Sequence, residues 1–386
     1  MCAQSVQAAL GFRGCSASAR QRFSGRISTS TDVAADGAGE PGDMNQHTTA
    51  RPAITAALGS GGCGMRIAFV SDPLDGLDPS TDTSVGLMHA AAGRGAEVWV
   101  TQAHLLEAVH GRARALARRM RLAPSRPAGD HRWTVAKRWY TVTEPRHVWL
   151  DEMSAVFMRT EPPVDLTYRT ATLILDLIDP ARTPVINDPR GLRACSEHLL
   201  GLRFPDLCPP TIVTADDRTI RAFLADHGAA VVKPADGFSG RGVLRLDRHD
   251  PNLGSLIEIS TRAGTRAVVV QRFQREVSAG NKRIFVVAGE PAGAVYRFPR
   301  AGDFRIGDPA AEAPVTARDR EICSRLAPTL RCHGIHLAGL DVIGTYLIEV
   351  NVTSVGALRK ADALLGWTLC ADLIDSVLGT QARRSA

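Results

Sequence analysis

Short apolar runs alternate with stretches of helical spacing from residue 65 onward. Runs rich in β-branched and other apolar residues predict strands at residues 66–70, 97–100, 154–158 and 183–186. Apolar residues three and four positions apart predict helices over residues 83–95 and 168–177. Strands that alternate with helices predict a parallel, layered α/β sheet. Because such sheets bind ligands at the carboxyl ends of their strands, Asp72, Arg159 and Asn187 are expected where chemistry would occur.

The first 64 residues have a different composition, rich in Ala, Ser, Thr and Gly with little apolar periodicity. Such a segment buries too little apolar area to offset its ordering entropy, so it is predicted to be disordered. Its glycine-rich end, residues 59–64, lacks the Lys-Ser/Thr ending of a phosphate loop, which favours a linker. Residues 1–31 contain arginine and serine without any acid, as a transit peptide would, but an over-extended start gives the same composition. Either way the folded protein is expected to begin at Met65.

The composition of the 386-residue chain, 44% hydrophobic and 22% charged, is that of an ordinary globular protein of two or three domains. No apolar run approaches the ~18 residues of a membrane span, so no membrane partner is expected. The eight cysteines include no C-x-x-C pair and are expected to be reduced thiols in the cytoplasm. The net charge of +6 suits an anionic small molecule as well as nucleic acid, and favours neither.

Residues 112–149 interrupt the regular pattern with many arginines, among which Trp133, Trp139 and Tyr140 are interleaved. Basic residues with aromatic residues can form a platform for single-stranded nucleic acid. The alternative is a solvated helix followed by a surface hairpin whose aromatic side chains pack inward. The second interpretation is favoured, so no nucleic-acid partner is expected.

A glycine-rich turn separates two predicted strands in the second half of the chain. The strand at residues 229–234 carries Lys233 near its end, residues 235–242 form the turn, and a second strand follows at residues 243–246. A phosphate loop of the Walker type would lead into a helix, so this pattern predicts a β-hairpin flap whose backbone N–H groups can line phosphates. Lys233 would supply a point charge for phosphate oxygens; the alternative is an ordinary exposed lysine.

Two apolar runs between residues 337 and 352 predict an antiparallel hairpin. If its loop spans residues 344–346, Asp341 lies opposite Glu349, with Asn351 further along the same face, whereas a two-residue turn would place the acids on opposite faces. Facing carboxylates repel each other, and a hard cation relieves that repulsion. Oxygen ligands of this kind suit Mg²⁺ together with substrate phosphates. The alternative is an exposed hairpin with incidental acids.

These elements, in this order, resemble the ATP-grasp superfamily and within it the bacterial glutathione synthetase family. The resemblance rests on residues 71–74, 158–165, 233–237 and 339–354, supported by residues 270–273, 282–283 and 297–299. It extends from about Met65 to Leu378, and the motifs are specific when taken together.

The resemblance implies an N-terminal parallel α/β domain at residues 65–187 and an ATP-grasp domain at residues 188–380. The latter would include a mobile β-hairpin lid at about 188–268, and residues 381–386 would form a tail. The implied activity is ATP-dependent ligation of a carboxylate to an amine through an acyl phosphate, with γ-glutamylcysteine and glycine as small-molecule substrates. The implied cofactors are ATP and one or two Mg²⁺ ions, which Mn²⁺ can replace. Relatives are often oligomers, so a homo-oligomer is compatible with the sequence.

The resemblance also implies residue roles. The magnesium ligands would be Asp341, Glu349 and Asn351. The arginines near the reacting phosphate would be Arg283 and Arg297. The ATP-binding residues would be Lys233 and His198 at the phosphates, Gly237, Ser239 and Gly240 in the flap, and Gln271, Arg272 and Phe273 at the adenine.

The chain departs from the family pattern at positions that touch the substrates. Family members carry a lysine where His198 stands, and an unperturbed histidine is mostly uncharged at neutral pH. Thr353-Ser354 is followed by Val355 and Gly356 rather than by Pro-Thr. Three functions therefore stay open: glutathione synthetase itself, a related ligase for another acid or amine, and a non-catalytic nucleotide-binding relative. The intact acids and arginines argue against the third.

Overall fold

The predicted strands of the first half form the parallel centre of an eight-stranded sheet. The computed structural model describes residues 64–237 and 240–384; residues 1–63 of the predicted extension and Ser239 of the predicted flap lie outside the described residues. The main strand order is β10-β9-β1-β2-β4-β3, with β7 and β8 also paired to β4. The strands are β1 (Arg66–Val70), β2 (Glu97–Thr101), β3 (Leu106–Val109), β4 (Arg112–Leu122), β7 (Tyr140–Val142), β8 (Arg146–Trp149), β9 (Ala155–Met158) and β10 (Val185–Ile186). Strands β1, β2, β9 and β10 pair in parallel, as predicted.

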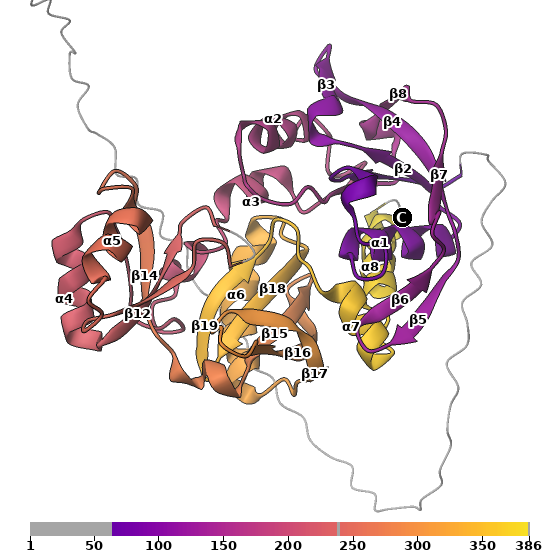
Figure 1. The fold of residues 1–386 in the computed structure, drawn as a ribbon. Coiled ribbons are helices and arrows are strands. Elements are labelled where there is room, and N and C mark those ends of the chain that lie inside the picture. Colours follow the sequence, from indigo (N-terminus) through magenta and orange to yellow (C-terminus); the bar gives the residue numbers. More distant parts are fainter. Residues whose placement is uncertain (1–63, 238–239, 385–386) are drawn as a thin grey trace, which may run out of the picture. The chain divides into compact units, whose positions relative to one another are not determined.

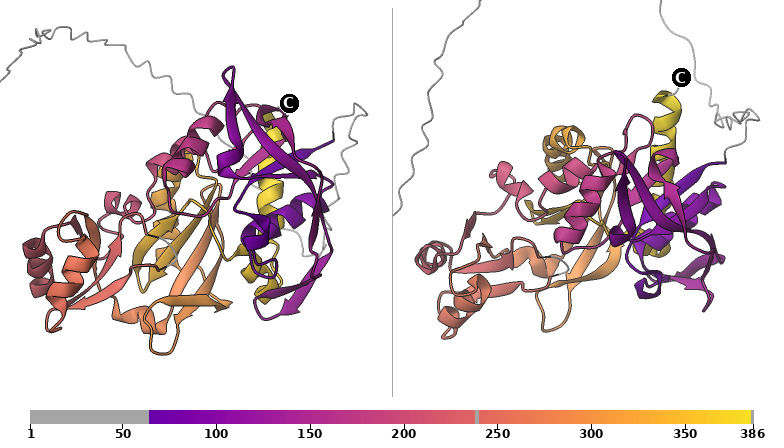
Figure 2. Two further views of the ribbon diagram at one scale, coloured as in Figure 1. Left: turned by 45° about the horizontal axis from the view of Figure 1, so that its top comes forward. Right: turned by 90° about the horizontal axis from the view of Figure 1, so that it is seen from above.

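The helices predicted over residues 83–95 and 168–177 are α1 (Thr83–Gly93) and α2 (Leu166–Leu175). Asp82 and Asp165 cap their first turns by accepting hydrogen bonds from backbone N–H groups. The C-terminal helix α8 (Leu369–Arg384) packs on α1 although the two are distant in sequence (Figures 1 and 2). No helix within the described ranges is both long and apolar enough to cross a membrane.

The prediction of a helix at the start of residues 112–149 is wrong, because this segment forms the long strand β4. Small apolar residues alternate with arginines along it, so that Ala113, Ala115 and Ala117 are buried while Arg112 and Arg118 are exposed. A period of two is typical of a strand with one buried face. The predicted surface hairpin does follow, as β5 (Ser125–Gly129) and β6 (Arg132–Val135).

Two antiparallel sheets make up the second half of the chain (Figure 1). The smaller has the order β11-β14-β12-β13 and includes the predicted flap hairpin. Its strands are β11 (Thr211–Thr214), β12 (Ala229–Pro234), β13 (Leu244–Asp247) and β14 (Val268–Arg272). Two helices, α4 (Asp217–His227) and α5 (Leu253–Thr261), connect them.

The larger antiparallel sheet has the order β17-β16-β15-β18-β19. Its elements are β15 (Asn281–Val287), β16 (Glu290–Pro299), β17 (Ile306–Glu312), α6 (Ala317–Cys332), β18 (Leu337–Ile343) and β19 (Tyr346–Asn351). Helices α3 (Pro189–Ala194) and α7 (Leu358–Leu365) and short 3-10 turns at Leu74–Gly76, Ala103–Leu105, Leu150–Glu152, Leu200–Arg203 and Arg275–Ala279 complete the described chain.

Successive residues of β15 point to opposite faces of this sheet. Ile284 and Val286 pack into a core that includes residues of α6, whereas Phe285 joins the core of the N-terminal sheet and of helices α1 and α8. Asn281 and Arg283 lie on the same face as Phe285. Strand β15 therefore presents Asn281 and Arg283 on the side that meets the N-terminal half.

The buried side-chain amide of Asn187 joins the N-terminal sheet to this sheet. Asn187 follows β10, and its Nδ2 donates to the carbonyls of Leu337 (2.8 Å) and Val352 (2.7 Å). Its Oδ1 accepts from the backbone N–H groups of His336 and Leu337, both at 2.8 Å. All the hydrogen-bonding capacity of the amide is thus used inside the protein.

We predict that Asn187→Ala lowers the free energy of unfolding by at least about 2 kcal/mol, because it leaves several buried backbone groups without partners. The measurement is the shift of the urea unfolding midpoint. Asn252→Ala is the matched control: Asn252 is exposed at the start of α5, and its side chain makes no capping hydrogen bond. Equal midpoints for the two variants would contradict a structural role for the Asn187 amide.

Candidate functional site

A row of charged residues crosses three neighbouring strands of the larger antiparallel sheet. Arg283 on β15 pairs in register with Asp341 on β18, and Asp341 pairs with Glu349 on β19. Directly opposed residues of antiparallel strands place their side chains side by side on one face. The structure therefore brings together the two predicted metal-binding acids and a predicted catalytic arginine.

The hairpin places Asp341 opposite Glu349 through a short turn and a β-bulge, and the sequence did not indicate this bulge. Ile343 pairs with Tyr346, so the turn has two residues, Gly344 and Thr345. The register then shifts between Asp341 and Val342, where Ile348 is the extra residue of a β-bulge. The bulge moves Glu349 back to the face of Asp341. The predicted loop length is wrong, but the predicted pairing of the two acids is confirmed.

Two arginines share the carboxylate of Asp341. The guanidinium of Arg283 bonds both of its oxygens, through Nε to Oδ1 and through Nη2 to Oδ2 at 2.9 Å. Arg297, on β16, reaches Oδ1 through Nη2 at 2.7 Å and also donates to Oδ1 of Asn281 at 2.6 Å. Burial opposes the charge of both arginines. For Arg283 the attraction of Asp341 outweighs burial and raises its pKa, whereas burial and the neighbouring charge of Arg283 lower the pKa of Arg297.

The two residues predicted to bind the phosphates, His198 and Lys233, lie beside Glu349. His198 Nε2 lies 3.4 Å and Lys233 Nζ 3.9 Å from its Oε2. His198 Nδ1 lies 2.8 Å from the carbonyl of Pro234, which can only accept, so Nδ1 carries a proton. Burial alone would raise the pKa of Glu349, but the hydrogen bond with His198 and the charge of Lys233 hold it well below its usual range. Lys233 is itself buried rather than an ordinary exposed lysine, and burial lowers its pKa.

The remaining predicted nucleotide residues lie on the smaller sheet and its hairpin. Gln271 is buried on β14 and donates to Thr211 Oγ1 at 3.0 Å. Arg272 lies over the ring of Tyr346, and Phe273 lies beneath the guanidinium of Arg245.

The flap glycines lie in the turn after β12. The N–H of Gly237 donates to the carbonyl of Pro234 at 3.1 Å. Gly240 has a φ of 69°, a left-handed conformation that glycine adopts without strain. This turn lies directly beyond Lys233, so the predicted phosphate lysine and the flap glycines belong to one hairpin.

The donor set of the row fits magnesium. Asp341 and Glu349 offer carboxylate oxygens, and the described residues contain no group of three His, Cys, Asp or Glu that could hold a metal. Asn351 Nδ2 donates to the Gly339 carbonyl (3.1 Å) and to Glu349 Oε1 (3.3 Å), which fixes the orientation of its amide beside the acids. Two carboxylates and one amide oxygen match the all-oxygen, partly protein-derived ligand set that Mg²⁺ prefers.

Two residues contribute to the site although their roles were not predicted. Asn281 anchors Arg297, as described above. Glu197 Oε1 accepts from the backbone N–H groups of Val352 (3.0 Å) and Thr353 (2.9 Å), directly after the strand that carries Glu349 and Asn351. Only its position next to His198 in the sequence could have suggested that Glu197 belongs here.

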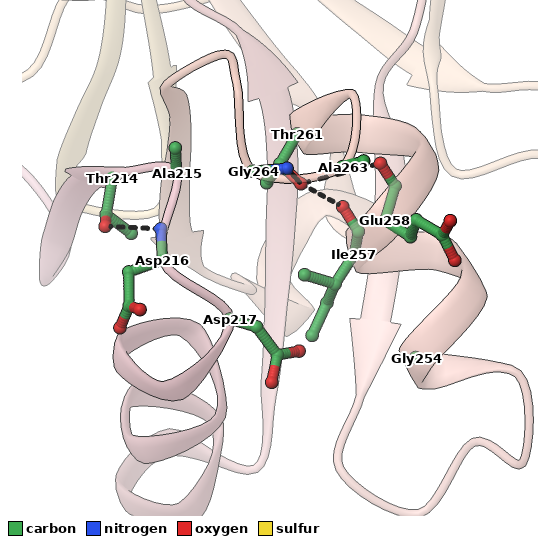
Figure 3. Close-up of a pocket in the computed structure, with 10 residues that line it drawn as sticks. All are labelled: Thr214, Ala215, Asp216, Asp217, Gly254, Ile257, Glu258, Thr261, Ala263 and Gly264. Atoms are coloured by element: carbon green, nitrogen blue, oxygen red, sulfur yellow. Dashed lines mark hydrogen bonds between the residues drawn. The ribbon is translucent and has the colours of Figure 1, made fainter. Parts of the chain in front are cut away.

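A separate hollow of about 620 Å³ lies between α4 and α5 and contains none of the predicted site residues (Figure 3). Polar groups of this hollow form hydrogen bonds next to the start of α4 and at the end of α5. Thr214 Oγ1 accepts from the N–H of Asp216, and Thr261 Oγ1 donates to the carbonyl of Ile257 and accepts from the N–H of Gly264. Both threonine hydroxyls of the lining are thus paired inside the protein.

Comparison with known proteins agrees with this arrangement. The family profile described as the prokaryotic glutathione synthetase N-terminal domain matches residues 65–193, and that of the prokaryotic glutathione synthetase ATP-grasp domain matches residues 197–366. The chain belongs to the prokaryotic glutathione synthetase family. The glutathione synthetase of Synechococcus elongatus is 45% identical over 306 residues, which cover 78% of this chain and 94% of that protein. The glutathione synthetase of a Nostoc species is 44% identical over 317 residues, which cover 81% of this chain and 98% of that protein.

Solved structures confirm the expected ATP-grasp fold. The ATP-grasp ligase PsnB, complexed with a precursor variant, Mg and ADP, covers 83% of this chain and 99% of its own with a TM-score of 0.53 and 18% identity. A RimK domain protein from Sphaerobacter thermophilus covers 81% of this chain and 100% of its own, with a TM-score of 0.53 and 20% identity. The resemblance found in the sequence is thus confirmed for family and for fold.

We predict that His198→Lys lowers the Michaelis constant for ATP about tenfold, because a lysine ammonium keeps its charge at every pH near neutrality, whereas an imidazole can lose it, so that a charge-assisted phosphate contact is always present. Initial rates at varied ATP concentration measure this effect. His198→Gln, which carries no charge, is the control and should not lower the constant. An unchanged or higher value for His198→Lys would mean that other cations hold the phosphates.

Proposed function

We propose that this protein is an ATP-dependent ligase that joins γ-glutamylcysteine to glycine. The observation that carries the proposal is the row of Arg283, Asp341 and Glu349 with Arg297 beside it, in a chain of the glutathione synthetase family. The row combines acidic oxygen ligands with buried cations on one rigid sheet face. That combination serves reactions in which a phosphoryl group is transferred by positioning and electrostatics.

The proposed reaction has two steps. A carboxylate oxygen of the acid attacks the γ-phosphorus of ATP, the bond to ADP breaks, and an acyl phosphate forms. The free amine of glycine then attacks the acyl carbon, and inorganic phosphate leaves as the amide forms and the nitrogen loses a proton. In both steps Arg283 and Arg297 face negative charge that grows on phosphoryl or acyl oxygens. No side chain needs to act as a nucleophile.

Asp341, Glu349 and Asn351 would hold Mg²⁺, as one or two ions that Mn²⁺ can replace. When bound, the metal supplies positive charge to the phosphate oxygens. The ion pairs of Asp341 with Arg283 and Arg297 hold both guanidiniums beside the acid that would bind the metal. Lys233, His198 and the flap residues Gly237, Ser239 and Gly240 would bind the phosphates, and residues 271–273 the adenine.

We further propose the architecture expected from the sequence, with an N-terminal domain at 65–187 and an ATP-grasp domain at 188–380 whose lid moves. The protein would work in the cytoplasm, in keeping with the absence of disulfides among its described cysteines.

One observation favours a related ligase with a different acid as the second candidate. Val355, where the family pattern has proline, accepts a hydrogen bond from the buried Arg159 through its carbonyl at 3.1 Å. The altered segment therefore contacts Arg159, which directly follows strand β9 of the N-terminal sheet.

The function is tested by ADP release from the full chain with Mg-ATP, γ-glutamylcysteine and glycine. Release that needs both substrates is the expected result. Release with a different acid or amine in a substrate panel would favour the related ligase, and bound ATP without any release would favour the non-catalytic alternative.

We predict that Asp341→Asn and Glu349→Gln each reduce magnesium-dependent ADP release by at least about a hundredfold, because each loses a charged metal ligand while keeping its shape. Glu290→Gln, at an exposed carboxylate at the other end of the same sheet, is the control and should keep full activity. Thermal unfolding of each variant verifies that it is folded. Activity retained in either site variant would remove that residue from the metal site.

A further inference from the structure

Gly339 is a position without a side chain in the middle of the charged sheet face. It lies inside β18, a strand whose seven residues are all buried, two residues from Asp341 and on the same face. It pairs in register with Phe285 on β15 and with Asn351 on β19. Its φ is outside the left-handed region, so conformational freedom does not explain the glycine. A glycine inside a strand weakens that strand and often marks a place that another group approaches closely.

The side chain of Arg283 occupies the space beside Gly339. A methyl group on residue 339 would lie only 3.1 Å from Cδ and 3.2 Å from Nη1 of Arg283. Arg283 pairs in register with Asp341, and its long side chain leans along the strand direction toward the glycine. Contacts this short would displace the arginine by a few tenths of an ångström. The missing side chain at residue 339 therefore makes room for Arg283.

Val355 confines the same space as a second wall. Its Cγ1 would lie 3.1 Å from the same methyl group, and its side chain is buried. Its carbonyl accepts a hydrogen bond from Arg159 at 3.1 Å, which holds this segment in place. Because Arg283 is buried as well, neither neighbour has free space into which to move. A methyl group at residue 339 would thus crowd both of them.

The position of Arg283 decides what the free nitrogen of its guanidinium can reach. Asp341 accepts hydrogen bonds from Nε and Nη2 of this group. None of the residues that the structure describes accepts a hydrogen bond from Nη1, so its two N–H donors are left for an oxygen of the substrate. Donors that stabilise growing negative charge act over a narrow range of distance. A group pressing on Nη1 and Cδ would therefore affect the rate of the reaction.

We propose that Gly339 is a positioning residue for Arg283: the absence of a side chain there, with Val355 as the second wall, fixes where Nη1 lies. The inference rests on the proposed function, in which Arg283 faces charge that grows on phosphoryl or acyl oxygens. It gives the glycine a role in the rate of the reaction and none in the binding of ATP.

The first test is Gly339→Ala in the full chain, assayed for ADP release with Mg-ATP, γ-glutamylcysteine and glycine. The value of kcat should fall about tenfold, because a displacement well below 1 Å already weakens stabilisation of the transition state. The KM for ATP should change less than about twofold, since the change acts on the transition state rather than on nucleotide binding.

Gly293→Ala is the matched control for crowding. Gly293 lies on β16 of the same sheet, where the nearest atoms to a new methyl group all belong to the ring of Trp367, the closest at 2.8 Å. Trp367 is only half-buried and can move aside. This variant should lose stability but keep kcat within about twofold, because the crowding does not reach Arg283.

A double-mutant cycle tests the contact without any assay of activity. Gly339→Ala should lower the midpoint of thermal unfolding by at least about 2 °C, since it overfills a buried site. In a chain that also carries Arg283→Ala the methyl group has room, so the same change should cost less than about half of that shift.

Val355→Ala added to Gly339→Ala gives a rescue of activity. It removes Cγ1 and lets the new methyl group move away from Arg283, so kcat should recover at least about threefold relative to Gly339→Ala alone. A glycine with only a structural role would not give this recovery, because a second truncation in the core lowers stability further. If Gly339→Ala does not fold by itself, the added Val355→Ala or Arg283→Ala should restore folding.

The outcomes separate this inference from the proposed function. The positioning role is overturned if folded Gly339→Ala keeps full kcat, if Gly293→Ala loses as much, if Val355→Ala restores no activity, or if neither added truncation restores folding to an unfolded variant. An equal thermal shift with and without Arg283 would also overturn it. If the unmodified chain releases no ADP, the proposed function fails, and the double-mutant cycle still decides whether Gly339 makes room for Arg283.

Discussion

The charge balance around Asp341 is the constraint on which the site depends. Arg283 and Arg297 are both buried, and a buried guanidinium is tolerated only where a carboxylate compensates it. Removing the partner of such a pair costs about 3–5 kcal/mol. The acid that would hold the metal therefore also keeps the two arginines folded into the sheet. Because all three belong to adjacent strands in fixed register, their geometry is set by backbone pairing rather than by flexible loops.

Asn187 gives the same sheet a fixed position against the N-terminal half. Its amide ties the end of β10 to Leu337, at the start of β18, and to Val352, just after β19. Glu197 holds the same segment after β19 from another side. The acids of the row thus stand on strands whose ends are bonded to the N-terminal sheet and to the segment that carries His198.

Most of the fold could be predicted from the sequence, because the apolar runs and helical spacings are local signals. The long strand β4 could not, since its arginines suggested a solvated helix although the small residues between them alternate with a period of two. In the site, the pairing of Asp341 with Glu349 was predicted on a wrong loop length, because a bulge such as that at Ile348 leaves no mark in composition. The partners of His198 come from distant parts of the chain, as do those of Asn187. Tyr168 was interpreted only as part of a helix, because an unsatisfied hydroxyl is a property of the packed structure.

Buried polar groups differ in whether the protein itself satisfies their hydrogen bonds. Asn187 has every donor and acceptor paired inside the protein, and the buried Lys282 is likewise bonded to Asp319 and to the Pro314 carbonyl. The hydroxyls of Tyr168 and Thr160 are also buried but have no partner in the described chain, so they add to the cost of folding rather than to stability.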